Sequence, residues 1–293
     1  MRSMMTAISL ACLTTSAFAD SVSVINATAF FPEGPVMIDG KLYYAQYSGN
    51  VATVWDGTSN IDFWKEDGCG PSAVVPVGGN FAITCYDSGK LEIISRDGKA
   101  VASHDKDAGG APLLGPNDGV PDATGEGAYF TLSGPWTPGP VVGRIVHLDR
   151  DGNLTEVAND LNYANGIAIG ADGRLYVAES YAGSVTSFAI GDDGSLSDRQ
   201  SFVHLYQLGE APEVFPDGIK VGPNGSFFIG LNSDAAILEV PADGSKVVAR
   251  HVFETAGTPN MTFSADGKTL FVMAVDNEGG APYEGRVLSA PLP

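Results

Sequence analysis

The stretch that decides the fold is NGIAIGADGRLYVAES, at residues 165–180. It joins two apolar runs through an Asp-Gly pair of the kind that favours tight hairpins, so it predicts two antiparallel strands. Similar stretches recur as DGIKVGPNGSFFIG at residues 217–230 and as EGPVMIDGKLYY at residues 33–44, with weaker copies beginning near residues 69, 118 and 259. A unit that recurs at this spacing is typical of propellers and solenoids.

A third predicted strand follows each hairpin, and in four copies it ends at another turn. These turns contain the pairs Asp97-Gly98, Asp151-Gly152, Asp193-Gly194 and Asp243-Gly244. A fourth strand completes the unit, for example at residues 246–253. Four strands in each of six units predict an all-β fold, a six-bladed β-propeller of four-stranded blades.

The last unit and the first strand of the chain complement each other. The sixth unit supplies only three strands, at residues 260–263, 269–275 and 286–290. Residues 21–29, ahead of the first unit, alternate like a strand that has no partner of its own. We expect this N-terminal strand to become the outer strand of the last blade and to close the ring, which avoids an open sheet edge.

Residues 1–19 are predicted to be an export signal, and residues 20–293 a single propeller domain. Arg2 gives a positive start, Met4 to Leu13 an apolar stretch, and Ala17-Phe18-Ala19 a small-x-small cleavage site. The apolar stretch is too short for a membrane span. A buried N-terminal helix and a lipid anchor on Cys12 are the alternatives. We expect a soluble periplasmic or secreted protein, and a monomer.

The composition is strongly acidic, with 35 Asp and Glu against 16 Lys and Arg and a formal net charge of −19. Such a charge disfavours nucleic acid and anionic membrane surfaces as partners. Small neutral ligands, cationic ligands and metal ions are not disfavoured as partners by this charge. Cys69 and Cys85 are spaced to lie on adjacent strands, which allows either a disulfide or two buried thiols, because spacing does not fix the Cα separation.

Polar residues begin the inner strands of the predicted blades, and in a propeller these strand starts meet at one mouth of the central channel. The positions are Glu33, Cys69, Asp118, Asn165, Asp217 and approximately Pro259, with Asn117 one residue outside the register. Hard oxygen donors without histidine suit Ca²⁺ or Mg²⁺ better than Zn²⁺. The alternative is that Asn and Asp before Gly are ordinary turn residues.

Four short segments resemble the signature segments of the senescence-marker-protein (regucalcin)/gluconolactonase family, in the family's order. They are Phe31 to Pro35, Pro116 to Gly119, Asn165 to Ile167 and Phe215 to Gly218. The resemblance implies a calcium-dependent six-bladed hydrolase in which Glu33, Asn165 and Asp217 ligate one divalent cation. Ca²⁺ is the expected ion, and Mg²⁺, Mn²⁺ and Zn²⁺ are alternatives. The resemblance further implies that Asn117 contacts substrate or metal, and that Asp118 or Asp217 moves protons.

Two departures from the family pattern concern the substrate. Gly115 stands where the sugar-lactone hydrolases usually have arginine, and residues 133–136, Ser-Gly-Pro-Trp, replace acidic residues that often follow the next hairpin. A polyhydroxylated lactone thereby loses two polar contacts. We expect Trp136 and Tyr181, with Phe31, to form a more apolar mouth that binds substrate together with Asn117, although aromatic residues also pack between blades.

Other catalytic patterns are absent from the sequence. It has no Gly-x-Ser-x-Gly elbow, phosphate loop or His-Glu-x-x-His motif. The histidines, at positions 104, 147, 204 and 251, fall in outer or connecting segments. The favoured function is metal-dependent hydrolysis of a lactone or related ester, by attack of water on a polarised carbonyl. The alternatives are a non-catalytic periplasmic propeller that binds a small molecule or protein around a structural metal, and a phosphotriester hydrolase.

Overall fold

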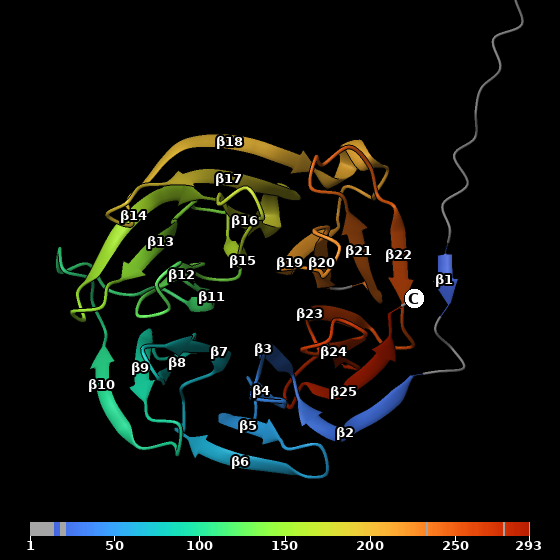
Figure 1. Cartoon of the computed structure of the whole chain (residues 1–293), viewed down its shortest axis with the longest axis horizontal. Coiled ribbons are helices and arrows are strands. Elements are labelled where there is room, and N and C mark those ends of the chain that lie inside the picture. Colours follow the sequence, from blue (N-terminus) through green and yellow to red (C-terminus); the bar gives the residue numbers. More distant parts are fainter. Residues whose placement is uncertain (1–14, 18–21, 233, 278, 293) are drawn as a thin grey trace, which may run out of the picture.

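The computed structural model describes residues 15–17, 22–232, 234–277 and 279–292. Within these residues the chain forms strands β1 to β25, two short 3₁₀ helices, η1 (Ser180–Ala182) and η2 (Leu205–Leu208), and no α-helix. The sheets lie side by side around a central axis (Figure 1). The protein is therefore all-β, as the repeated pattern predicts, and its architecture is consistent with a propeller of four-stranded blades.

Four sheets contain four antiparallel strands each, in chain order. The first consists of β3 (Pro32–Ile38), β4 (Lys41–Gln46), β5 (Val51–Trp55) and β6 (Asn60–Lys65). The second consists of β7 (Pro71–Val77), β8 (Asn80–Cys85), β9 (Lys90–Ile94) and β10 (Ala100–His104). The third consists of β11 (Pro116–Pro121), β12 (Ala128–Leu132), β13 (Gly143–Leu148) and β14 (Leu154–Leu161). The fourth consists of β15 (Ala164–Ile169), β16 (Leu175–Glu179), β17 (Ser184–Ile190) and β18 (Leu196–His204).

The remaining strands form one nine-stranded sheet. Its members are β19 (Phe215–Val221), β20 (Phe227–Asn232), β21 (Ala236–Val240), β22 (Ala249–Val252), β23 (Gly257–Phe263), β24 (Thr269–Val275), β25 (Glu284–Pro291), β2 (Ser23–Phe30) and β1 (Thr15–Ala17). A single residue pair, Leu231 with Thr258, links β20 to β23. The strand predicted over residues 21–29 is β2, which pairs antiparallel with β25.

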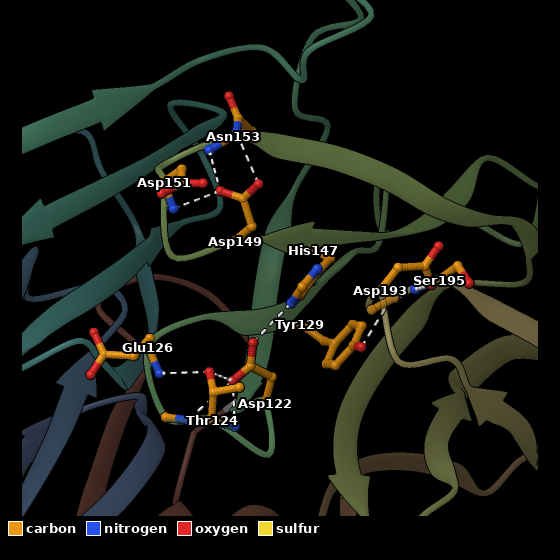
Figure 2. Close-up of polar contacts among 12 residues, drawn as sticks. Asp122, Thr124, Glu126, Tyr129, His147, Asp149, Asp151, Asn153, Asp193 and Ser195 are labelled. Atoms are coloured by element: carbon orange, nitrogen blue, oxygen red, sulfur yellow. Dashed lines mark hydrogen bonds and ion pairs between the residues drawn. The ribbon is translucent and has the colours of Figure 1, made fainter.

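The Asp-Gly pairs form tight turns, because glycine adopts a positive φ and a nearby carboxylate accepts the backbone N–H groups of the turn. Between β13 and β14, Gly152 has φ +85°. Asp149 accepts N–H hydrogen bonds from Asp151 and Asn153, each at 2.9 Å (Figure 2). These local contacts fix the hairpin register that the sequence predicts.

The core lies between neighbouring sheets and is built from alternate residues of their strands. One cluster joins Val75 and Leu91 of the second sheet to Phe130 and Leu148 of the third. Fully burying a side chain of this kind contributes roughly 1.5–3 kcal/mol. Since each sheet is covered on both faces by its neighbours, the short strands are stabilised mainly by packing between sheets.

The two cysteines left open by the sequence form a disulfide. Cys85 ends β8, Cys69 lies just before β7, and their Cα atoms are 4.6 Å apart. This separation falls within the range that a disulfide spans. The alternative of two free thiols is therefore wrong.

The predicted export signal falls mostly outside the described residues. The segment Thr15–Ala17 is described, and as β1 it pairs in parallel with β22. Among the described residues, no helix is both long enough and apolar enough to cross a membrane. The cleavage site and the location of the protein stay predictions.

Candidate active site

The six strands that begin the repeats are the innermost strands of the molecule (Figure 1). In the order β3, β7, β11, β15, β19 and β23, each contacts the next, and β23 contacts β3. The pairing of each inner strand shifts register near its start. A shift of this kind is a β-bulge, which re-aims side chains and often lies beside active sites. The polar residues at or next to these shifts are Glu33, Ser72, Asn117, Asp118, Asn165, Asp217 and Asn260.

Glycine follows several of these polar residues because the inner strands approach one another closely. A Cβ atom on Gly166 would lie 2.1 Å from the backbone oxygen of Asp217. One on Gly218 would lie 2.3 Å from Cγ of Asn260. Asn165 and Asp217 belong to strands β15 and β19, so the alternative that they are turn residues is wrong.

A cavity of about 430 Å³ opens over the starts of the inner strands. All four residues predicted as oxygen ligands line it, namely Glu33, Asn117, Asn165 and Asp217. Its other lining residues are Phe31, Tyr47, Ser72, Tyr86, Trp136, Tyr163, Asn232 and Tyr283. This cavity combines a polar set of oxygen atoms with an aromatic wall. Its lining, as far as the chain is described, includes no lysine, arginine or histidine.

Hydrogen bonds hold the two carboxylates of the cavity. Gly34 donates its backbone N–H to Oε2 of Glu33 at 2.8 Å, and Nδ2 of Asn260 donates to the same oxygen at 3.0 Å. Nδ2 of Asn232 donates to Oδ2 of Asp217 at 3.0 Å. Both carboxylates therefore have fixed orientations, as a preorganised site requires.

Two asparagine side chains are held by serine hydroxyls that follow neighbouring strands. Nδ2 of Asn117 donates to Oγ of Ser133 at 3.0 Å, and Nδ2 of Asn165 donates to Oγ of Ser180 at 3.2 Å. In both contacts the amide nitrogen faces the serine. The amide oxygen is then the atom that a cation would contact.

The carboxylates are buried, and burial disfavours their charged forms. Burial raises the pKa of Glu33 to about 8, against the hydrogen bonds from Gly34 and Asn260. Burial, followed by the nearby charge of Glu33, raises the pKa of Asp217 well above its ordinary value. A divalent cation would compensate both charges, and this set of carboxylate and amide oxygens fits Ca²⁺ or Mg²⁺. The described residues contain no group of three or more His, Cys, Asp or Glu arranged to hold a metal, so the amides are essential to the fit.

The two candidate proton carriers line different cavities. Asp217 lines the first cavity, whereas Asp118 lines a second cavity of about 390 Å³. This second cavity is bordered by residues from the ends of the inner strands, including Lys220 and Val221. Oδ2 of Asp118 forms an ion pair with Nζ of Lys220 at 3.3 Å. The structure thus brings Glu33, Asn117, Asn165 and Asp217 together and separates Asp118 from their cavity.

Aromatic rings form a collar around the first cavity. Here the aromatic collar means Phe31, Tyr47, Tyr86, Trp136, Tyr163 and Tyr283. Tyr47 contacts Phe31, Tyr86 and Tyr283, with ring centroids 5.8, 6.2 and 6.3 Å away. The Tyr163 ring lies 4.6 Å from that of Trp136. Tyr181, predicted to bind substrate, does not line the cavity but supports Trp136 at a centroid distance of 4.8 Å.

Three of the four tyrosine hydroxyls of the collar already have partners. Tyr47 donates to Asp87 at 2.9 Å, Tyr86 to the backbone oxygen of Gly134 at 2.8 Å, and Tyr163 to the hydroxyl of Tyr86 at 3.0 Å. Since these hydroxyl donors are engaged, the collar offers ring surface more than hydrogen-bond donors.

Sequence reasoning missed several lining residues, although a signal for some of them exists. Tyr47 and Tyr86 directly follow the second strands β4 and β8, and Asn232 ends β20. The corresponding position in three of the six repeats therefore lines the same cavity. Phe31 and Tyr163 directly precede inner strands with positive φ, +50° and +62°. Such backbone for a bulky residue is uncommon and often marks a functional site.

Among the described residues, no histidine lines this cavity. On β13, Nε2 of His147 lies 3.1 Å from Oδ2 of Asp122, and its ring stacks on Tyr129 at 4.4 Å (Figure 2). His251 lies on β22 and stacks on Phe228. These two rings pack on the third and fourth strands of their sheets, away from the cavity. Their sequence positions predict this placement.

Known proteins resemble this chain in sequence and in fold. Pentonolactonase XacC of Haloferax volcanii is 30% identical over 149 residues, which is 49% of each chain. An Arabidopsis thaliana protein named strictosidine synthase-like 2 is 27% identical over 96 residues, 32% of this chain and 25% of that one. The chain thus spans about half or less of the length of these curated relatives.

Solved structures share the fold over nearly the whole chain. A gluconolactonase from Xanthomonas campestris superimposes with a TM-score of 0.75 at 22% identity, covering 94% of this chain and 91% of that one. A calcium-binding regucalcin from Agrobacterium tumefaciens superimposes with a TM-score of 0.74 at 16% identity, covering 95% of both. The family model described as SMP-30/Gluconolactonase/LRE-like region matches residues 31–276. The chain therefore belongs to the SMP-30/gluconolactonase/LRE-like family.

Proposed function

We propose that this protein is a metal-dependent hydrolase of a lactone or related ester. The observation that carries the proposal is the convergence of Glu33, Asn117, Asn165 and Asp217 on one cavity, with both carboxylates buried. Membership of a family that includes gluconolactonases, and similarity to a protein named pentonolactonase, support a lactone as substrate. Ca²⁺ is the proposed ion, because the donors are hard oxygens and a structural relative is named a calcium-binding regucalcin.

Glu33, Asn165 and Asp217 would hold the cation, with Asn117 beside them in contact with cation or substrate. The chemistry that such an ion supplies is Lewis-acid polarisation of the substrate carbonyl. Asp217 would accept the proton of the attacking water, because its carboxylate lines the cavity beside the other oxygen donors. The water oxygen bonds to the carbonyl carbon and the ring C–O bond breaks. The proton then passes from Asp217 to the leaving oxygen, which gives a hydroxy acid.

Asp217 is a better candidate for the base than Asp118. Asp217 lines the cavity with the other donors, whereas Asp118 faces the second cavity and is paired with Lys220. Replacing Asp217 by Asn should lower kcat by about a hundredfold or more, the usual contribution of a general base.

The wall of the cavity favours a substrate with few hydroxyl groups. Gly115 has φ +60°, and a Cβ there would lie 2.8 Å from the backbone oxygen of Gly134 and 2.9 Å from Cε2 of Tyr86. The Tyr86 ring thus fills the space that an arginine at position 115 would need. Because three of the four tyrosine hydroxyls of the wall are engaged and position 115 has no side-chain donor, extra hydroxyls on the substrate should gain little. Less polar lactones should therefore be hydrolysed at least as efficiently as gluconolactone.

The deciding experiment measures kcat/KM for a panel of lactones with Ca²⁺, after chelation, and after Ca²⁺ is restored. We expect hydrolysis that disappears with the chelator and returns with the ion, and an alkyl-substituted lactone that is no worse than gluconolactone. A preference for gluconolactone of about tenfold, worth about 1.4 kcal/mol, would contradict the substrate assignment. If the loaded protein hydrolyses no lactone or ester, the non-catalytic binding function replaces the catalytic one.

We infer that the nine-stranded sheet is two four-stranded blades joined by one residue pair, with β1 added at the edge of β22. Together with the other four sheets this makes six blades, closed by β2. The antiparallel pairing of β2 with β25 and the closed series of contacts among the inner strands support this count. We also propose export to the periplasm or medium after cleavage before Asp20, as a single domain over residues 20–293. Mass spectrometry of the exported protein should give Asp20 as the first residue, and detection of Met1 or of a lipid on Cys12 would contradict it.

A further inference from the structure

A continuous polar chain runs along the axis from the first cavity to the second. Nδ2 of Asn260 lies 3.0 Å from Oε2 of Glu33 and 3.4 Å from Oδ2 of Asp118. Oδ2 of Asp118 in turn accepts a hydrogen bond from Nζ of Lys220 at 3.3 Å. The chain begins at the proposed cation site and ends at the floor of the second cavity.

Three carboxylates therefore share the centre of the molecule. Glu33, Asp118 and Asp217 are 6%, 2% and 3% exposed, so none is solvated to any extent. The charge of Asp118 acts on both Glu33 and Asp217, where it disfavours ionisation. If all three were ionised with no cation nearby, this cluster would carry three negative charges in a buried region, which is strongly unfavourable.

Lys220 is the cation that meets this cluster. It lies on β19, three residues after Asp217, and its side chain is 20% exposed in the second cavity while that of Asp118 is 3% exposed. Among the residues that the structure describes, no lysine, arginine or histidine lines the first cavity. The ammonium of Lys220 thus offsets one of the three carboxylate charges and leaves two facing the cation site.

We propose that Lys220 is a positioning residue that sets the charge of the axial carboxylates to match one divalent cation. The inference rests on the cation site proposed above and assigns Asp118 to charge balance instead of proton transfer. Through Asn260, the Asp118–Lys220 pair also holds the amide that orients Glu33. In this arrangement Lys220 and Asp118 contact neither cation nor substrate. They act on the site through the electrostatic field of their charges and through the hydrogen bonds of Asn260.

The electrostatic role predicts opposite effects of the two single substitutions on Ca²⁺ binding. Asp118→Asn removes a negative charge and leaves Lys220, so Ca²⁺ affinity should fall by about tenfold. Lys220→Met removes the positive charge and leaves Asp118, so Ca²⁺ affinity should rise by about tenfold, or a second equivalent should bind. The double variant removes both charges and should return to within about twofold of the native affinity.

Isothermal titration calorimetry of the whole protein with Ca²⁺ alone measures affinity and stoichiometry independently of activity. Lys220→Arg keeps the charge and should stay close to the native affinity, and Lys268→Met, a substitution on the exposed turn before β24, is the matched control. Circular dichroism shows which variants fold. Because unpairing a buried charge is destabilising, the double variant, which leaves neither group unpaired, keeps the test valid if Lys220→Met does not fold.

Three results overturn the proposal in distinguishable ways. Unchanged affinity in both single variants would show that the pair does not set the field at the site. A loss of affinity in both would show a merely structural role. Absence of divalent-cation binding by the native protein would remove the cation site together with this inference. Binding of Ca²⁺ without hydrolysis of any lactone would instead overturn the catalytic proposal alone and leave the role of Lys220 open to the same titration.

Discussion

At the residue scale, the buried carboxyl of Glu33 makes cation binding compete with protons. Its pKa is raised by burial from 4.5 to about 8, so the folded, metal-free protein holds a proton there that the unfolded chain releases. The stability from this group is full below pH 4.5 and is lost as the pH rises through about 8. Ca²⁺ affinity should change in the opposite sense and increase over the same range, because the ion binds the ionised carboxylate.

Thermal unfolding at a series of pH values, with and without Ca²⁺, checks both signs. The gain in Tm from Ca²⁺ should increase with pH in the native protein. Glu33→Gln cannot release a proton, and this dependence should be much weaker in that variant. A Ca²⁺ effect that is the same at every pH would show that Glu33 does not bind the ion.

Trp136 gives a second prediction at this scale. Its side chain is 45% exposed and stands over the cavity against Tyr163 and Tyr181. Trp136→Ala should lower kcat/KM for a lactone with an alkyl or aromatic substituent by about tenfold, while Trp136→Phe keeps most of the activity. Tyr206→Ala removes an aromatic side chain that is 61% exposed outside the cavity and serves as control. An equal loss for unsubstituted and substituted lactones would contradict a role of Trp136 in specificity.

The polar residues of the site could be predicted from the sequence, whereas most of the aromatic residues that line the cavity could not. Glu33, Asn165 and Asp217 each precede glycine in a recognisable repeat, and the structure places them on one cavity. In the second and sixth repeats the polar residues at the bulges are Ser72 and Asn260, whereas simple alignment points to Cys69 and Pro259. A bulge adds a residue without changing the strand pattern, so spacing alone does not locate the side chain that faces the axis.

At the scale of elements, the hairpins were predictable because their turn residues act locally. The strands predicted over residues 269–275 and 286–290 correspond to β24 (Thr269–Val275) and β25 (Glu284–Pro291). Contacts between elements were less predictable. The Cys69–Cys85 bridge depends on the distance between two strands, and the Asp118–Lys220 pair joins strands that are about a hundred residues apart, which no local pattern encodes.

The disulfide gives a prediction for the pair of strands that it joins. It closes a loop with a sequence separation of 16, and a loop of this length is stabilised by about 3 kcal/mol relative to the reduced chain. The double substitution Cys69→Ser with Cys85→Ser should therefore lower the free energy of unfolding by about that amount. Reducing agent should produce the same loss in the native protein and no further loss in the variant. Equal stability of oxidised and reduced native protein would contradict the prediction.

At the scale of the whole molecule, the pairing of β2 with β25 joins the first sheet to the last. Ala29 on β2 is 1% exposed and packs in a cluster with Tyr44 of the first sheet and Val287 of β25. The cation site depends on this packing, because Glu33 lies on β3, three residues after the end of β2, while its hydrogen-bond partner Asn260 lies on β23. The packing of the first sheet against the last and the geometry of the site are therefore coupled through β2.

Ala29→Asp tests this coupling, because it places a carboxylate among buried apolar side chains between the first and last sheets. The free energy of unfolding should fall by more than about 3 kcal/mol, and Ca²⁺ affinity should fall with it. Val24→Asp is the matched control, because Val24 lies on the same strand and is 52% exposed, so that charge stays in solvent. Chemical denaturation and Ca²⁺ titration measure the two effects, and size-exclusion chromatography should show association of the Ala29→Asp protein as the edge of β25 becomes available for pairing. If both variants keep native stability and remain monomeric, β2 does not close the ring.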